Sequence, residues 1–214
     1  EAKVERLRAF GFELPPSGLA AGKLVLAFEN VSFGWPGESP LLQALSLRLS
    51  GPERVAVTGP NGSGKTTLIK LAMGALAPAG GRVVRGVEAA LMDQTTRTLR
   101  PDETLVQAFK RLNPAATDNA AHAALARFLF RNAAALKTVG SLSGGERLRG
   151  ALACALMGEA PPQLIILDEP TNHLDLDSVE AVEAALLGYD GALLVVSHDR
   201  AFLEAVGIER EIRL

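Results

Sequence analysis

The segment from Gly59 to Thr67, Gly-Pro-Asn-Gly-Ser-Gly-Lys-Thr-Thr, constrains the fold of this chain more than any other stretch. It matches the phosphate-binding pattern in which a glycine-rich turn connects a buried strand to a helix. Residues 53–58 predict the short strand, and residues 65–73 have apolar residues at helical spacing. Backbone N–H groups of such a turn converge on phosphate oxygens, and the helix dipole adds its positive end. The segment therefore predicts a site for a nucleoside triphosphate.

Residue types within this segment indicate individual roles. Lys65 is expected to reach the outer phosphates, and the Thr66 hydroxyl is expected to ligate Mg²⁺. A glycine-rich loop with one exposed lysine is the alternative, which the flanking strand and helix disfavour. The nucleotide contacts expected here are Gly59, Asn61, Gly62, Ser63, Gly64, Lys65, Thr66 and Thr67.

Composition excludes several classes of protein. About half of the 214 residues are apolar and 21% are charged, which is ordinary for a soluble globular protein. The longest apolar run, residues 151–157, is far below the roughly 18 residues of a membrane span, so we expect no integral membrane segment. A single cysteine, Cys154, excludes an internal disulfide and predicts a reducing, cytoplasmic setting.

Strands and helices alternate along the chain, which predicts an α/β fold. Continuous apolar runs at 164–167 and 192–196 are typical of strands buried on both faces of a parallel sheet. Residues 1–22, a charged stub followed by a Pro/Gly joint, are expected to end an interdomain linker, with the nucleotide-binding domain at 23–214. Further expected elements are strands at 24–31 and 46–50, a strand pair around 83–92, a helix at 145–158 and an inserted helical subdomain over about 95–158.

Two carboxylates, Asp168 and Glu169, follow the apolar run at 164–167. Ligands bind at the carboxyl ends of strands in open α/β sheets, which would place these groups near the phosphates. Asp168 is suited to hold the Mg²⁺ water shell, and Glu169 is suited to orient or deprotonate a water that attacks the γ-phosphate. Many strands end in acidic turns, so the pair alone is a weak signal. The phosphate loop upstream is what makes it indicate a catalytic site.

A second glycine-rich helix start, Leu142-Ser143-Gly144-Gly145-Glu146, makes the combination specific. With it, the chain resembles the nucleotide-binding domain of ATP-binding cassette (ABC) proteins from about residue 24 to residue 214. The resemblance implies ATP and Mg²⁺ as ligands and a RecA-like P-loop NTPase core, mainly parallel, with an N-terminal antiparallel β-subdomain and the inserted helical subdomain. It also implies that Ser143, Gly144, Gly145 and Glu146 contact the ATP of a second cassette; standing alone, the motif would suggest only a helix cap.

Other positions match smaller motifs of the family. The resemblance implies that Gln94 contacts Mg²⁺ and water, that Asp175 communicates across the cassette dimer, and that His198 acts with Glu169 at the γ-phosphate. A histidine after an apolar strand is otherwise usually a polar cap. Trp35 stands where the family places an aromatic residue, more often Tyr, that stacks on adenine.

The ABC-F group is the branch that Glu146, residues 168–175 and residues 197–203 most resemble. Its members carry two cassettes and act on the ribosome without membrane domains. The resemblance implies that this chain is the C-terminal cassette of a ribosome-associated translation or antibiotic-resistance factor. It also implies a slow ATPase in isolation. The partner would be a second cassette, either in the same full-length chain or in a homodimer. The alternative is the ATPase subunit of a membrane transporter, which needs a groove near Gln94 for a partner helix. Nine basic against four acidic residues over 97–149 fit RNA or a solvated helical surface.

Overall fold

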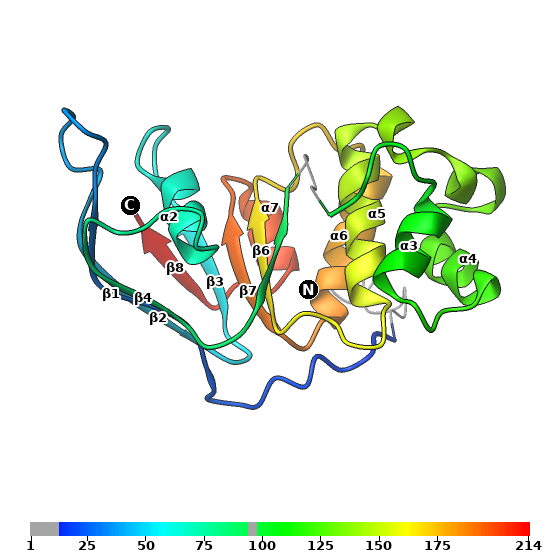
Figure 1. Ribbon diagram of the computed structural model, residues 1–214, viewed down its shortest axis with the longest axis horizontal. Coiled ribbons are helices and arrows are strands. Elements are labelled where there is room, and N and C mark those ends of the chain that lie inside the picture. Colours follow the sequence, from blue (N-terminus) through cyan, green and yellow to red (C-terminus); the bar gives the residue numbers. More distant parts are fainter. Residues whose placement is uncertain (1–12, 94–97) are drawn as a thin grey trace.

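The computed structural model describes residues 13–93 and 98–214. Two sheets and a helical lobe lie in a row, with the antiparallel sheet at one end and the helical lobe at the other (Figure 1). The antiparallel sheet has the strand order β2-β1-β4, and the parallel sheet has the order β5-β6-β7-β3-β8. The α/β prediction is therefore confirmed.

The antiparallel sheet consists of β1 (Leu24–Phe33), β2 (Leu42–Ser50) and β4 (Gly80–Arg85). Its first two strands are longer than the sequence indicated, because β1 pairs with both β2 and β4 along its length. The prediction that two strands around 83–92 pair with each other is wrong. The segment does contain two strands, but β4 joins the antiparallel sheet whereas β5 (Ala89–Met92) pairs with β6 in the parallel sheet.

The parallel sheet brings the carboxyl ends of its strands to one edge. Its strands are β5, β6 (Leu164–Asp168), β7 (Ala192–Val196), β3 (Arg54–Thr58) and β8 (Arg210–Arg213). Val196 pairs with Asp168 on one side and with Val57 on the other. The turns after β3, β6 and β7 therefore emerge close together, although they are far apart in the sequence.

Alternate residues of the central strands enter two different cores. Val57, Ile166 and Val196 belong to the core shared with the antiparallel sheet and with α2 (Lys65–Ala72). Ile165 and Val195 belong to the opposite core, which contains residues of α6 (Leu176–Gly188) and α7 (Arg200–Ala205). Burial on both faces explains the unbroken apolar runs in these strands.

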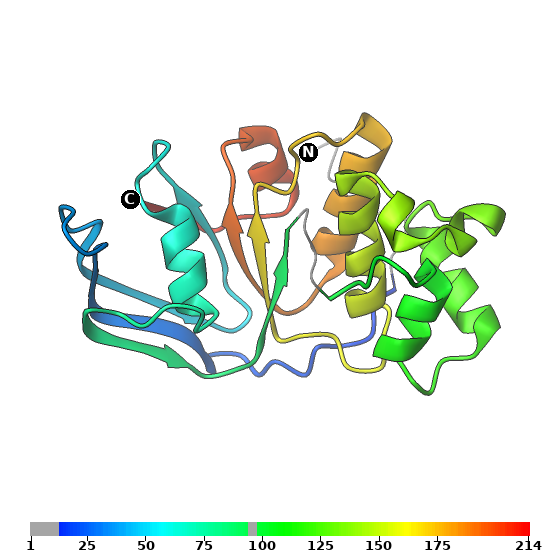
Figure 2. The same cartoon turned by 45° about the horizontal axis from the view of Figure 1, so that its top comes forward.

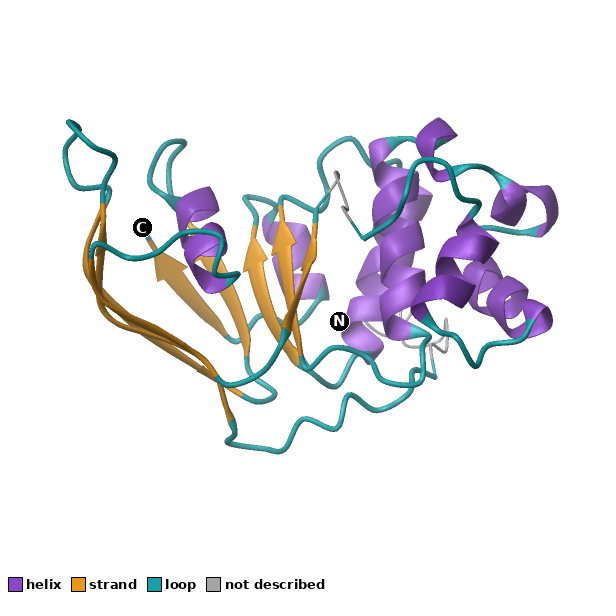
Figure 3. Ribbon diagram, in the orientation of Figure 1, coloured by secondary structure: helices purple, strands orange, loops and turns teal. Residues whose placement is uncertain are grey.

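The helical lobe contains α3 (Leu105–Leu112), α4 (Asp118–Arg127), α5 (Gly144–Leu156) and two short 3₁₀ helices, η1 (Asn132–Leu136) and η2 (Val139–Ser141). Figure 3 shows these helices gathered beyond the edge of the parallel sheet. The expected inserted helices are therefore present. The predicted helix at 145–158 is α5, which begins one residue earlier and ends two residues earlier.

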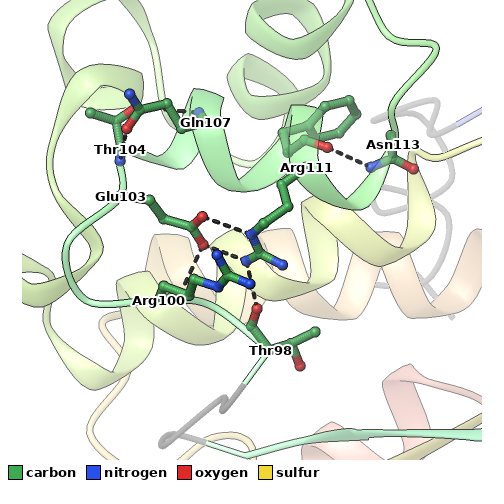
Figure 4. A network of polar contacts seen from close by, with 8 residues as sticks. Thr98, Arg100, Glu103, Thr104, Gln107, Arg111 and Asn113 are labelled. Carbon is green, nitrogen blue, oxygen red and sulfur yellow. Dashed lines mark hydrogen bonds and ion pairs between the residues drawn. The ribbon is translucent and has the colours of Figure 1, made fainter.

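A half-buried ion pair fastens the start of this lobe to α3. Arg111 donates to Glu103 from Nε at 2.8 Å and also from Nη2 (Figure 4). The same Nη2 donates to the carbonyl of Thr98 at 2.8 Å, and the Arg100 N–H donates to Glu103 at 2.9 Å. The segment 98–103 is therefore joined to α3 through a single carboxylate–guanidinium contact.

Residues 13–23 cross the molecule at the amino ends of the parallel strands, opposite the edge that carries the turns after β3, β6 and β7 (Figure 2). The Ser17 N–H donates to Asp190 at 2.9 Å, and Arg127 of α4 donates to the carbonyl of Glu13 at 3.3 Å. This stretch is thereby hydrogen-bonded to a residue just before β7 and to the helical lobe. Most of the predicted linker, residues 1–12, lies outside the described residues.

Within 13–93 and 98–214, the helices are too short or too polar to cross a membrane.

Candidate functional site

The turn between β3 and α2 is shaped by glycines. Gly62 and Gly64 have φ angles of 83° and 103°, in the left-handed region that side chains disfavour. Gly64 is also the N-cap of α2 and makes no side-chain cap, so the first N–H groups of the helix stay available to a ligand. Ser63 Oγ is buried and has no hydrogen-bond partner within the described residues. A buried hydroxyl without a partner in this turn fits a site that binds a polar ligand.

Lys65 lies across the turn that it follows. Its Nζ donates to the carbonyl oxygens of Gly59 at 2.7 Å and Pro60 at 2.9 Å. These carbonyls hold the ammonium group at the mouth of the loop, where it can meet a phosphate. The turn and the acidic pair predicted beside it line one cavity of about 270 Å³. Its lining is Leu41, Asn61, Gly62, Gly64, Lys65, Thr66, Thr67, Asp168 and Glu169.

Carboxylates crowd the carboxyl edge of the sheet beside this cavity. Burial raises the pKa of Asp168, and the nearby charges of Glu169 and Asp93 raise it further, against the opposing effect of Lys65. Oxygen ligands of this kind, next to a hydroxyl such as that of Thr66, suit Mg²⁺. Asp93 is a site residue that the sequence analysis missed. Strand register places it there: Met92 pairs with Leu167, and an aspartate follows each of these two residues in the sequence.

Glu169 and His198 meet where β6 and β7 end. Oε1 of Glu169 lies 3.4 Å from Nε2 of His198, and the histidine side chain is 52% exposed. The Glu169 N–H donates to the carbonyl of Val196 at 2.8 Å, which holds the start of the turn against β7. Glu169 has a φ of 45°, so its backbone is in the left-handed region that non-glycine residues rarely adopt. The predicted pair is therefore assembled at the edge of the cavity.

The second glycine-rich helix start begins α5. The Ser143 hydroxyl accepts a hydrogen bond from the Glu146 N–H at 3.1 Å, and Glu146 Oε2 accepts one from the Ser143 N–H at 2.8 Å, which forms a capping box. No residue of 142–146 is among those that line the cavity at Lys65. The helix start and the phosphate loop lie at the same edge of the molecule, separated by the width of the parallel sheet (Figure 1).

Gly145 also has a packing role. A Cβ at this position would lie 2.3 Å from Cδ2 of Leu174, so the start of α5 and the turn before α6 approach closely here. Asp175, one residue further on, is the N-cap of α6 and accepts from the Ser178 N–H at 2.7 Å. Hydrogen bonds from Ser178 lower the pKa of Asp175. The two elements predicted to act on a second cassette are thus in contact with one another.

Trp35 and Gln94 complete the set of predicted site residues. Trp35 is 43% exposed and meets the buried Phe33 edge-on, with ring centroids 5.2 Å apart. It is not among the residues that line the cavity, where Leu41 stands instead. Leu41 was missed because an aliphatic residue after a Pro-rich turn has no distinctive sequence signal. Gln94 lies outside the described residues.

A glycine-rich phosphate loop, a strand ending in paired carboxylates and a separate glycine-rich helix start on a helical lobe together define an ATP-binding cassette. The family model described as ABC transporter matches residues 42–172. The chain belongs to the ABC family.

Curated relatives agree with the branch that the motifs indicated. The chain is 39% identical over 188 residues to the putative ATP-binding protein YdiF of Bacillus subtilis, covering 87% of this chain and 29% of that protein. It is 38% identical over 207 residues to the probable ATP-binding protein YheS of Escherichia coli K12, covering 95% and 32%. It is 39% identical over 195 residues to the ATP-binding protein Uup of Haemophilus influenzae, covering 88% and 30%. The chain therefore spans less than a third of these relatives.

Solved structures confirm the fold. The dimeric post-hydrolysis structure of the ATP-binding cassette MJ0796, bound to ADP and Pi, matches with a TM-score of 0.72 and 24% identity, over 89% of this chain and 94% of that one. A bacterial Atm1-family ABC exporter with ATP bound matches with a TM-score of 0.71 and 22% identity, over 90% of this chain and 37% of that one. At these identities the likeness establishes the cassette fold alone.

Proposed function

We propose that this chain is a Mg²⁺-dependent ATP-hydrolysing cassette that forms one half of each ATP site and requires a second cassette for the other half. One observation carries the proposal. Lys65 and Glu169 line one cavity with His198 beside Glu169, whereas the start of α5, which Ser143 caps, lies on another part of the same molecular edge. A single cassette thus presents its phosphate loop and the glycine-rich start of α5, here called the signature helix, at separate places on this edge.

The site residues have separate roles in the proposed reaction. The N–H groups of the loop and Lys65 hold the β- and γ-phosphates, which fixes the γ-phosphorus for in-line attack. Glu169 accepts a proton from the attacking water, and His198 donates a hydrogen bond at the γ-phosphate. Asp168, Thr66 and Gln94 would hold Mg²⁺, directly or through water. Bound there, the ion would neutralise charge on the phosphates.

Ser143 and the N–H groups of Gly144 and Gly145 would contact the γ-phosphate of the ATP held by the second cassette. The Ser143 oxygen accepts from Glu146, so its own hydrogen is available to a phosphate. An isolated chain would therefore bind ATP but hydrolyse it slowly, because half of its site is missing.

Association with the ribosome is the part of the proposal that concerns the whole protein. It is supported by the ABC-F features of the motifs, with the chain as the C-terminal of two cassettes. The basic residues of the helical lobe support it less than their number indicated. Lys110, Arg111 and Lys137 form ion pairs with Asp118, Glu103 and Glu146, and Arg149 is buried. A solvated surface accounts for much of that charge.

One observation favours the transporter alternative. A cavity of about 450 Å³ lies between β5, α3 and α5, and Met92, Thr98 and Leu99 on its wall flank the 94–97 segment. A helix of a membrane partner could enter there. The cavity does not require such a partner, since it is also the junction between the helical lobe and the edge strand.

Cosedimentation with ribosomes distinguishes these functions. The full-length protein with Glu169→Gln should pellet with ribosomes in ATP and less in ADP, because the variant keeps ATP bound. Glu204→Gln, a change of an exposed carboxylate elsewhere, is the matched control. Absence of ribosome binding, together with copurification of a membrane protein, would establish the transporter function instead.

A further inference from the structure

Glu146 places a carboxylate in the first turn of the signature helix. Its Oε2 is occupied by the Ser143 N–H, which leaves Oε1 facing Lys137 at 3.2 Å. Burial opposes ionisation of Glu146, but the Ser143 N–H and Lys137 together hold its pKa below the ordinary value. A negative charge therefore lies against the backbone of Ser143, the residue whose hydroxyl caps the helix.

That charge is unfavourable for the function proposed above. If the helix start is to meet a triphosphate, an uncompensated carboxylate beside it would repel the ligand. This chain supplies a cation from the segment that precedes the helix.

Lys137 is held in place by its backbone. It follows η1, and its carbonyl accepts from the N–H of Leu105 at 3.3 Å, at the start of α3. The neighbouring Thr138 bridges to Thr104. The lysine and glutamate side chains are 50% and 25% exposed, so the pair adds little to folding stability. Its position at the helix start indicates a different purpose.

We propose that Lys137 is a positioning residue of the site in trans: it neutralises Glu146 so that the signature helix can accept the triphosphate of a second cassette. The inference rests on the proposed function. Replacing Lys137 with Gln should leave the fold and the capping box intact but expose the incoming phosphates to the charge of Glu146. Replacing Glu146 with Gln as well should restore binding, because the amide oxygen can still accept from Ser143 without carrying a charge.

The test measures dimerisation of the Glu169→Gln chain in Mg–ATP by sedimentation velocity. Adding Lys137→Gln should weaken the dimer about tenfold, and the defect should shrink as salt is raised. The further change Glu146→Gln should remove most of that defect, and Lys137→Arg should show little defect. The matched control Lys110→Gln breaks another exposed pair of the helical lobe, with Asp118, and should leave dimerisation unchanged.

One further measurement keeps the outcomes distinct. ATP affinity of the monomer should be the same in all variants, because Lys137 and Glu146 do not line the cavity at Lys65. If Lys137→Gln behaves like Lys110→Gln, or if Glu146→Gln fails to rescue it, the role of Lys137 is refuted while the ATP-dependent dimer stands. If the Glu169→Gln chain binds ATP but stays monomeric, the proposed ATP site shared by two cassettes and this inference are both overturned.

Discussion

Oε1 of Glu169 and Nε2 of His198 lie 3.4 Å apart across the carboxyl ends of β6 and β7. Twenty-eight residues of chain separate them, yet the pairing of Asp168 with Val196 fixes them side by side. A carboxylate that is to take a proton from water and an imidazole that is to contact the γ-phosphate must share this neighbourhood. The distance between the two side chains therefore allows both to act on one γ-phosphate.

Glu169→Gln should reduce ATP turnover by about 10²–10³-fold, because the amide cannot accept the proton of the attacking water. ATP binding should persist, since the phosphate loop is unchanged. Phosphate release and nucleotide binding measure the two effects separately. Glu204→Gln should leave both unchanged; turnover near the parent level in Glu169→Gln would refute the assignment of Glu169.

His198→Ala should slow turnover by about ten- to a hundredfold, which corresponds to the loss of one hydrogen bond to a charged group. The effect should fall mainly on kcat, and His198→Gln should recover part of it by donating through its amide. His122, on α4 and away from the cavity, provides the control His122→Ala. Equal kinetics in the two alanine variants would show that His198 only caps its strand.

Lys65→Ala should weaken ATP binding by about ten- to a hundredfold, since the variant loses the cation at the phosphate loop. Its contacts to the carbonyls of Gly59 and Pro60 are local, so the fold should persist. Titration with a fluorescent ATP analogue measures the affinity. Lys70→Ala, on the exposed side of the same helix, should bind as the parent does. Unchanged affinity in Lys65→Ala would contradict the phosphate-loop assignment.

The Arg111–Glu103 contact should contribute to stability in a pH-dependent way. Hydrogen bonding to Arg111 lowers the pKa of Glu103. The contribution is therefore complete above the unfolded-state pKa, about 4.3, and is lost as the pH falls through the folded-state value. Glu103→Gln should cost about 1–2 kcal/mol at neutral pH.

Thermal melts at several pH values measure this contribution. The difference in Tm between the parent and Glu103→Gln should be largest near neutral pH and should narrow below about pH 4. Asp118→Asn removes a more exposed pair, with Lys110, and should change Tm much less. A Tm difference that grows on acidification would contradict the assignment.

The sequence predicted most of the cassette because its signals are local. Apolar runs identified β6 and β7, and the glycine pattern identified the loop before α2. Pairing between segments that are far apart in the sequence leaves no comparable local signal. β4 and β5 follow one another in the sequence with only residues 86–88 between them, so nothing local showed that they enter different sheets.

The site residues show the same difference between local motifs and long-range packing. Lys65, Asp168, Glu169 and His198 stand in recognisable motifs, and the fold brings them together. Asp93 and Leu41 join the site through strand register and loop packing, which single motifs do not encode. The contact between Gly145 and Leu174 likewise depends on how α5 and α6 approach.

Mixing two inactive variants tests most directly whether the phosphate loop is half of a site. At an ATP concentration that fills the parent's phosphate loop but not the weakened loop of Lys65→Ala, this variant lacks the ATP-binding half and Ser143→Arg lacks the signature half, so each variant alone should be inactive. Mixed in equal amounts, they should regain about a quarter of the parent's turnover, because half of the random pairs are mixed and each mixed pair has one complete site. A mixture that stays inactive, or a Ser143→Arg chain that hydrolyses ATP at the parent rate, would contradict the claim.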